Sequence, residues 1–278
     1  MSSAIEKALS LTAGEAGLAA QLDGDFSNGP VSQPPEAGLP FGGLLAALCA
    51  RAMRQGLGLT GPLRSLSVQY LSMAAYDMPL VFRPRLLRGG RSVAYATVEA
   101  WQGERITHHG QATFGADVAG ERLAPSSAPP PPLDSLDPAR TLDGPMLPRF
   151  ARHVEYRFET GPHILGGNVG RAPVERMWMR LGDNRPLDAD GLCYLLDAIY
   201  PPSWTAFREP PVMTSVDLRY DLLGEPTPEI APDGWAFFEF RLLDHGGGWA
   251  VDEAACWGAD GQPLAVARQR RKVLPARS

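Results

Sequence analysis

The sequence has few cysteines, few histidines and no excess of positive charge. It carries three cysteines, five histidines and a formal net charge of −5 over 278 residues. Cys49, Cys193 and Cys256 lie far apart and form no C-x-x-C pair, so we expect reduced thiols in a reducing compartment. Because acidic side chains outnumber basic ones, the chain lacks the electrostatic footprint of a nucleic-acid binder, and no nucleic-acid partner is expected.

Long hydrophobic runs are also missing. No segment is long and apolar enough to span a bilayer, and the first apolar stretch is interrupted by Glu6, Lys7 and Glu15, unlike a secretory signal. We therefore expect a cytoplasmic protein without membrane insertion. The apolar fraction of 44% is enough for a buried core, and the length predicts two core-forming units.

The common catalytic and metal-binding signatures are absent as well. There is no G-x-S-x-G, no H-E-x-x-H and no paired Cys/His spacing, so neither a serine-hydrolase elbow nor a zinc site is predicted. Gly56, Gly58 and Gly61 satisfy G-x-G-x-x-G, but they follow a helical stretch and precede a strand, the reverse of the order in a dinucleotide-binding fold. We expect no metal and no cofactor.

The chain contains one helical segment before a run of strands, twice over. In the first half we expect a helix at 42–55 and strands at 65–73, 80–87, 92–101 and 105–114. In the second half we expect strands at 153–158 and 174–180, a helix at 188–200, and strands at 213–223, 235–243, 248–257 and 264–273. Strands joined by short turns pair antiparallel, and each helix must bury its apolar face on the sheet, which predicts an α+β fold.

A proline-rich stretch divides the two halves. Its sequence, APSSAPPPPLD, cannot supply the amide donors that a helix or sheet needs, so it predicts a stiff surface linker. We therefore divide the chain into an N-terminal unit at 1–123, a linker at 124–145 and a C-terminal unit at 146–278.

The two halves are similar to each other in sequence. The segment RLLRGGRSVAYATVEAW, at 85–101, aligns without a gap on RLLDHGGGWAVDEAACW, at 241–257. Further pairs extend the alignment: Ser67 with Ser215, Val68 with Val216 and, after a longer turn, Gln111 with Gln269. The pattern indicates a duplication, and polar residues present in only one copy are then candidates for a functional site.

Asp197 is such a residue. It interrupts the apolar helical stretch LCYLLDAIY, and its approximate counterpart in the first helix, near Ala50-Arg51, is not acidic. A lone helix acid is more commonly an exposed, solubilising residue, and that alternative stays open.

Gln269 and Ser215 are the other candidates. Gln269 alternates with Ala265 and Ala267 on one strand face, where small neighbours leave space for a ligand or water, although a structural, hydrogen-bonded glutamine explains the pattern equally. Simple alternation places Ser215 on the polar face of its strand. A bulge or an interface between the halves is needed to turn it inward, and Thr214 is the competitor if the register differs.

The order of these segments is similar to that of a known family. The segments RPLDADGLCYLLDAIYPP, TSVDLRYDL and GGGWAVDEAACWGADGQPLAVARQ, preceded in the first half by GGLLAALCARAM, SLSVQYLS and QATFG, resemble the acyl-CoA thioesterase II family and its double-hotdog relatives. The resemblance covers most of the chain outside the linker and its flanks, and no single motif in it is diagnostic. It implies a tandem double hotdog, each half a central helix packed on a curved antiparallel sheet, with the active site in the C-terminal unit.

The resemblance also implies a reaction and its residues. The family's hydrolytic trio is an Asp, a Thr or Ser, and a Gln, which match Asp197, Ser215 and Gln269. These would hold one water for direct attack on an acyl-CoA thioester, with Asp197 biased toward general base. The residues expected to bind substrate are Phe41, Gly42, Gly43 and Thr214.

Two departures and two alternatives remain. Phe41 stands where relatives often carry a polar residue, which leaves substrate size and binding open, and Ser215 stands where the bacterial enzyme has threonine.

The main alternative is a non-catalytic double hotdog that binds an acyl-CoA or a protein partner. A hydratase or dehydratase is disfavoured, because such enzymes usually need an Asp/His or Glu/His pair and no histidine lies on the candidate helices. Open sheet edges favour a homo-oligomer.

Overall fold

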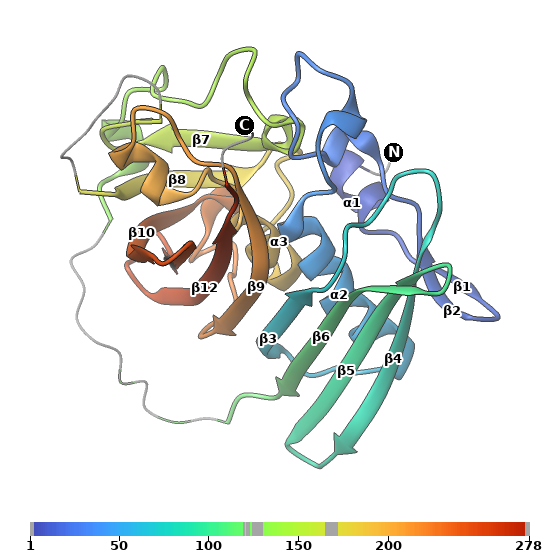
Figure 1. Ribbon diagram of the computed structural model, residues 1–278. Helices are drawn as coiled ribbons and strands as arrows, with labels where there is room; N and C mark the ends of the chain where they lie inside the picture. The colour runs from blue at the N-terminus through green and yellow to red at the C-terminus, as the bar shows by residue number, and fades with distance from the viewer. Residues whose placement is uncertain (1–2, 119, 121–122, 124–129, 165–171, 276–278) are drawn as a thin grey trace.

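The computed structural model describes residues 3–118, 120, 123, 130–164 and 172–275. Within these residues the strands form one antiparallel sheet of twelve, in the order β1-β2-β4-β5-β6-β3-β9-β12-β11-β10-β8-β7. The first half of the chain supplies one end of this order and the second half the other, so each half contributes its own curved layer (Figure 1). The α+β class expected from the sequence is confirmed.

The first half packs one long helix on its strands. Its elements are α1 (Ala4–Ala8), β1 (Thr12–Gly14), β2 (Gly17–Ala20), α2 (Gly42–Leu57), β3 (Leu63–Tyr70), β4 (Leu80–Gly89), β5 (Val93–Gln102) and β6 (Arg105–Gly115). Helix α2 is rich in leucine and alanine and begins after Phe41. It ends at Gly58, whose positive φ of 62° lets its amide bond back to the Arg54 carbonyl. Its buried face contacts β4, β5 and β6.

The second half repeats the plan with a shorter helix. Its elements are β7 (Val154–Phe158), β8 (Val174–Leu181), α3 (Ala189–Leu195), β9 (Met213–Leu222), β10 (Ala236–Gly246), β11 (Trp249–Trp257) and β12 (Pro263–Val273). Short 3-10 turns complete the fold: η1 (Gly24–Phe26), η2 (Pro35–Ala37), η3 (Leu133–Ser135), η4 (Arg149–His153), η5 (Pro202–Ala206) and η6 (Pro232–Gly234).

Helix α3 is shorter than the 188–200 expected. Asp188 caps its start, accepting a bond from the Gly191 amide at 2.7 Å. Pro201 disfavours helical backbone at the residue before it, and the Ala198 carbonyl accepts a bond from the Tyr156 hydroxyl at 2.7 Å instead of a helical amide. Residue 197 therefore lies just beyond the helix rather than within it.

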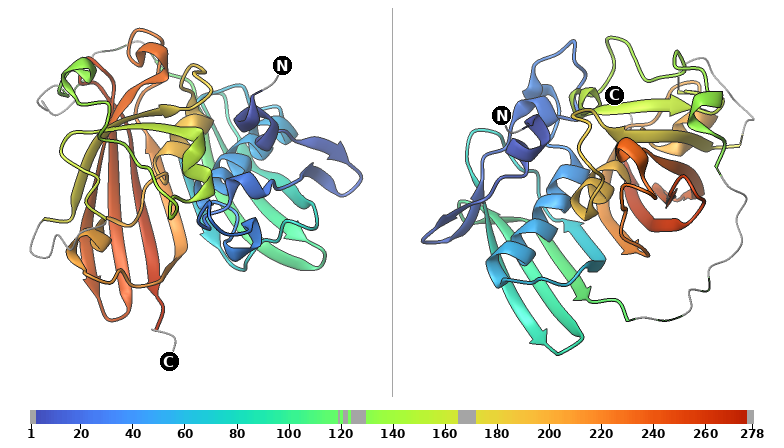
Figure 2. Two further views of the ribbon diagram at one scale, coloured as in Figure 1. Left: turned by 90° about the horizontal axis from the view of Figure 1, so that it is seen from above. Right: turned by 180° about the vertical axis from the view of Figure 1, so that it is seen from behind.

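The halves join edge to edge through β3 and β9, which pair antiparallel. Helices α2 and α3 lie side by side inside the curved sheet, as both views in Figure 2 show. They run in opposite directions, because the start of α3 meets the later turns of α2. Buried residues from both halves belong to one continuous hydrophobic cluster. No helix among the described residues is long and apolar enough to cross a membrane.

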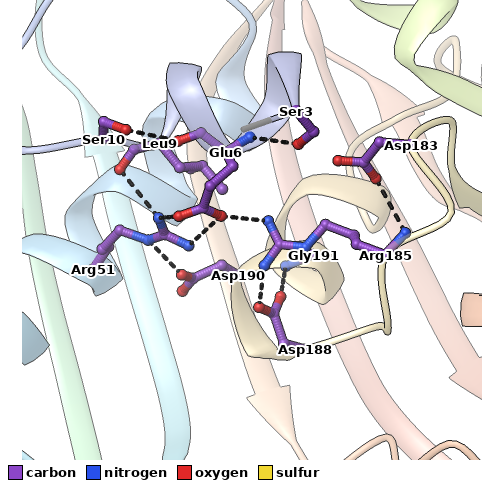
Figure 3. A network of polar contacts seen from close by, with 10 residues as sticks. All are labelled: Ser3, Glu6, Leu9, Ser10, Arg51, Asp183, Arg185, Asp188, Asp190 and Gly191. Carbon is purple, nitrogen blue, oxygen red and sulfur yellow. Dashed lines mark hydrogen bonds and ion pairs between the residues drawn. The ribbon is translucent and has the colours of Figure 1, made fainter. Parts of the chain in front are cut away.

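An ionic network holds the start of α3 against the first half (Figure 3). Arg51 of α2 contacts Glu6 and Asp190, at 2.8 Å each. Arg185 contacts the other oxygen of Glu6 at 2.9 Å and also bonds to Asp188. Because these charges are partly buried and share partners, they fix α1, α2 and α3 relative to one another more firmly than isolated surface pairs would.

The strand registers support the duplication and correct part of the alignment. Leu86 pairs with Ala96 and Leu242 with Asp252, and a bulge follows the same residue in both hairpins, as the gapless alignment requires. From these anchors, Ala96 pairs with Ala112 while Asp252 pairs with Gln269. The counterpart of Gln269 is therefore Ala112. Our prediction that it is Gln111 was wrong. By the same ladders, the counterpart of Ser215 is Leu63, not Ser67.

The proline-rich segment is partly described. Residues 124–129, where we placed the start of the linker, lie outside the described residues. Further on, the Pro131 carbonyl accepts a bond from the Trp178 indole at 2.9 Å, and Leu136 packs in a small cluster with Trp178, Trp235 and Phe237. This later part of the segment therefore packs against β8 and β10 and is not simply a surface linker.

Candidate active site

Asp197 is buried between the two halves. Its residue is 7% exposed, which excludes the solubilising role that the sequence left open. Burial raises the pKa of Asp197 to about 6, against the opposing effects of the Arg271 charge, the Gln269 side chain and the Gly43 amide. A carboxyl group with that pKa is largely ionised near neutral pH and is matched to accepting a proton there.

The start of α2 meets this carboxylate. A Cβ on Gly42 would lie 2.8 Å from Asp197 Oδ2, and a Cβ on Gly43 would lie 2.8 Å from the Tyr194 carbonyl oxygen. Glycine is therefore required at both positions for the helix end to approach so closely. The hydroxyl of Tyr70 donates to the Gly42 carbonyl at 2.8 Å and fixes this contact. The positive end of the helix dipole then faces the buried charge.

Replacing Gly42 by alanine should impair the site without unfolding the protein. The added methyl would displace the Asp197 carboxylate, and displacements of this kind commonly reduce kcat by roughly 10- to 100-fold. Unfolding free energy should change by no more than about 1 kcal/mol, because alanine favours the helix. Steady-state kinetics and denaturant unfolding measure the two effects. Gly246→Ala, where a Cβ meets open space, is the control, and equal activity in both variants would contradict the placement.

A β-bulge turns Ser215 into the site. On β9, Asp217 pairs with Arg270 and Ser215 with Arg271, which leaves Val216 as the extra residue. Gln269 Nε2 then donates to Ser215 Oγ at 2.6 Å. Because the serine oxygen accepts this bond, its own hydrogen remains available to another acceptor.

Thr214 lies differently from Ser215. It is exposed, pairs with Lys272 and is not among the residues that line the cavity beside Asp197. The structure therefore brings Ser215, and not Thr214, to the other candidate residues.

Two further charged residues belong to the cluster and were not predicted. Arg271 Nε donates to Asp252 Oδ2 at 2.6 Å, and Arg271 Nη2 bonds to Gln269 Oε1 and lies 3.9 Å from Asp197 Oδ1. Arg271 belongs to the basic segment ARQRRK, and a run of this kind is more commonly a solvated strand edge. Alternation along β11 could have revealed Asp252, because it shares the buried face of Ala250 and Ala254.

A cavity of about 220 Å³ opens beside these groups. Asp197, Ser215, Arg271 and Gly42 lie on its polar side. Its remaining wall is largely apolar and includes Leu147, Phe150, Ile164, Trp204 and Met213.

Phe41 is part of the same wall. It is buried, and its ring stacks on Phe150 with centroids 3.8 Å apart. The aromatic residue that departs from the family pattern therefore helps to shape the cavity. The whole arrangement joins a buried carboxylate, a hydroxyl and amide pair, and a hydrophobic pocket.

The equivalent positions in the described part of the first half carry other residues. Leu63, Ala112 and Phe114 stand at the positions of Ser215, Gln269 and Arg271 in the corresponding ladders. Near the counterpart of Asp197, helix α2 carries Arg51, which pairs with the start of α3. The candidate polar residues are therefore concentrated in one of the two symmetry-related positions.

Solved structures share this fold. A conserved hot dog fold protein of unknown function from Alicyclobacillus acidocaldarius is 20% identical, with 100% of both chains covered and a TM-score of 0.85. The acyl-CoA thioesterase II TesB2 of Mycobacterium marinum is 20% identical, with 98% of this chain and 99% of the other covered and a TM-score of 0.74. The tesB protein of Mycobacterium avium subs paratuberculosis is 19% identical, with 98% of each chain covered and a TM-score of 0.74. These likenesses confirm the double hotdog expected from the sequence.

Family models describe the sequence itself. The acyl-CoA thioesterase N-terminal domain matches residues 30–115, and the acyl-CoA thioesterase C-terminal domain matches residues 124–270. No curated protein sequence matches the chain. Since the two models follow each other over most of its length, the chain belongs to the acyl-CoA thioesterase family.

Proposed function

We propose that this protein hydrolyses an acyl-CoA to the free acid and CoA by direct attack of water, with Asp197 as the general base. The observation that carries the proposal is the buried Asp197 carboxylate, which lines an apolar cavity beside Ser215 and is supported by Gln269. A hydrophobic pocket that ends at a carboxylate matches an apolar acyl group whose carbonyl must meet an activated water.

The reaction needs one proton transfer into the site and one out. Asp197 accepts a proton as the water oxygen bonds to the thioester carbonyl carbon, and the Ser215 hydroxyl and Gln269 amide orient that water. The start of α2 at Gly42 lines the cavity, and its backbone amides are the candidate donors to the developing oxyanion. The carbon–sulfur bond then breaks, and the proton held by Asp197 passes to the departing CoA thiolate.

The non-catalytic alternative would use the same pocket for binding alone. Two sequence observations favour it: the missing acid in the first helix and the expected outward facing of Ser215. The bulge in β9 opposes the second of these. Release of free thiol from short, medium, long and aromatic acyl-CoAs separates the two functions. Hydrolysis of at least one substrate supports the enzyme, whereas binding without release across the whole panel would favour the binding module.

The cavity also sets an expected substrate size. An apolar cavity of about 150 Å³ holds benzene, so 220 Å³ has room for on the order of eight carbon atoms. Each methylene that enters the pocket adds about 0.8 kcal/mol, or roughly a fourfold gain in kcat/KM. We expect kcat/KM to rise from acetyl-CoA to octanoyl-CoA and then to level off or fall.

A variant that enlarges the pocket tests the same point. Met213→Ala removes bulk from the wall and should move the optimum to longer chains. Thr214→Ala, on the neighbouring exposed residue, should leave the optimum unchanged. A flat profile from acetyl to palmitoyl in the unmodified protein would contradict a pocket of this size.

A further inference from the structure

Two opposite charges are buried directly behind the candidate base. The side chains of Arg271 and Asp252 are 11% and 6% exposed, and their 2.6 Å contact joins β12 to β11 on the inner face of the sheet. Burying such a pair is costly, and a hydrophobic pair of similar volume is often at least as stable. Stability alone therefore gives no strong reason for these two residues to stand here.

The guanidinium fixes the orientation of the Gln269 amide. Arg271 Nη2 can only donate, so the Gln269 oxygen must face it, and the Gln269 nitrogen must then face Ser215, 2.6 Å away. Asp252 holds the guanidinium from the other side through Nε. Without this arrangement the amide could rotate by half a turn and present an acceptor to Ser215.

The same guanidinium faces the base. Arg271 Nη2 lies 3.9 Å from Asp197 Oδ1. A small void of about 10 Å³, close to the least that one water needs, has Asp197, Asp252, Gln269 and Arg271 among its lining residues. Within the described part of the chain, Asp252 Oδ1 is buried and has no hydrogen-bond donor, and Asp252 is among the residues that line this void.

The equivalent position in the first half does not carry this pair. In the first half the ladders place Ala96 at the position of Asp252 and Phe114 at the position of Arg271. The apolar copy shows that the sheet can be built without the charges. We propose that Arg271 and Asp252 are positioning residues, which orient the Gln269 amide and set the ionisation of Asp197 from opposite directions; this rests on the function proposed above.

Three tyrosines near Asp197, and the histidine that packs on one of them, do not titrate near neutral pH. Burial raises the pKa of Tyr70, Tyr194 and Tyr220 well above the usual value, so these hydroxyls stay neutral. Burial also lowers the pKa of His108, whose ring lies edge-on to Tyr70, to about 3. Arg271 and Asp252 are thus the charges that bear on Asp197, the first favouring its ionised form and the second opposing it.

Two substitutions should therefore shift the pH profile in opposite directions. The base must be ionised, so kcat/KM rises with pH through the pKa of Asp197. Arg271→Met removes the favourable charge and should move the midpoint up by about one unit, whereas Asp252→Asn removes the opposing charge and should move it down. Arg271→Lys keeps the positive charge but cannot bond to Asp252 and Gln269 through two separate nitrogens. The midpoint of its pH profile should therefore stay near that of the unmodified protein while kcat falls.

The controls separate this proposal from a purely structural role. Arg268→Met, on the exposed face of the same strand, should leave the midpoint and kcat unchanged. Thermal melting identifies any variant that fails to fold, and Asp252→Asn, which keeps the size of the side chain, still tests the direction if Arg271→Met does not fold. Midpoints that stay in place, or move in the same direction, would overturn the proposal.

A second readout does not depend on the substrate. Titration of the Asp197 carboxyl carbon by NMR, assigned by its loss in Asp197→Asn, should show the same opposite shifts in the two variants. If no acyl-CoA is hydrolysed but the shifts occur, the proposed reaction is wrong while the electrostatic role stands. If hydrolysis occurs and the carboxyl titrates identically in all variants, the positioning role is wrong.

Discussion

Asp197→Asn should lower kcat/KM for the best acyl-CoA by about 10²- to 10⁴-fold, the usual contribution of a positioned general base. Asparagine keeps the size of the side chain and one acceptor oxygen but cannot accept the proton of the attacking water. The residual rate should come from the pocket and the helix end, which still orient the thioester. Free-thiol release at substrate concentrations well below KM measures the loss.

An exposed aspartate provides the matched control. Asp244→Asn on β10 makes the same chemical change away from the cavity and should retain full activity. Both variants must show the melting behaviour of a folded protein for the comparison to count. Activity that survives in Asp197→Asn would mean that another group accepts the proton.

The same substitution should make the protein more stable at neutral pH. The folded-state pKa of Asp197 is about 6, above the reference value of 3.8, so the ionised carboxylate opposes folding. The difference of roughly two units corresponds to about 3 kcal/mol. This destabilisation is fully present above the folded pKa and disappears as the pH falls below the unfolded value, where both forms are protonated.

Denaturant unfolding at two pH values tests that sign. Asp197→Asn should exceed the unmodified protein in unfolding free energy by up to about 3 kcal/mol near pH 7.5. The two proteins should be nearly equal near pH 3.5. If the variant were less stable at neutral pH, the interactions of the ionised carboxylate with its partners would outweigh the cost of burying its charge, and the predicted sign would be wrong.

The hydrophobic pattern predicted most of the sheet strands and α2. The end of α3 and the β-bulges were harder to predict. The strands at 80–87 and 105–114 appear as β4 and β6 with ends that differ by one or two residues. The early end of α3 was missed because apolar periodicity continues to Tyr200. In the structure the amides of Asp197 and Ala198 bond to the carbonyls three residues earlier and no longer follow the α-helical pattern.

Side-chain direction at the site depended on bulges. Strict alternation turns Ser215 outward, and only the extra residue Val216 in the ladder turns it inward. Sequence identity was also misleading, because Gln111 is exposed and corresponds to Arg268. The turn before β12 is one residue longer than the turn before β6, whereas pairing Gln111 with Gln269 requires a turn two residues longer.

The two missed charges illustrate a further limit. Arg271 follows Arg268 and Arg270 in a basic run, and composition alone predicts that such a run is solvated. What buries Arg271 is its place opposite Ser215, together with Asp252 on the adjacent strand. Both are contacts between strands, which a single sequence does not specify.

The most direct test of the central claim is the mass of the products after octanoyl-CoA is incubated with the protein. We expect free CoA and octanoic acid in equal amounts, with no acyl group left on the protein. Unchanged octanoyl-CoA, or a CoA ester that has gained or lost the mass of water, would contradict it.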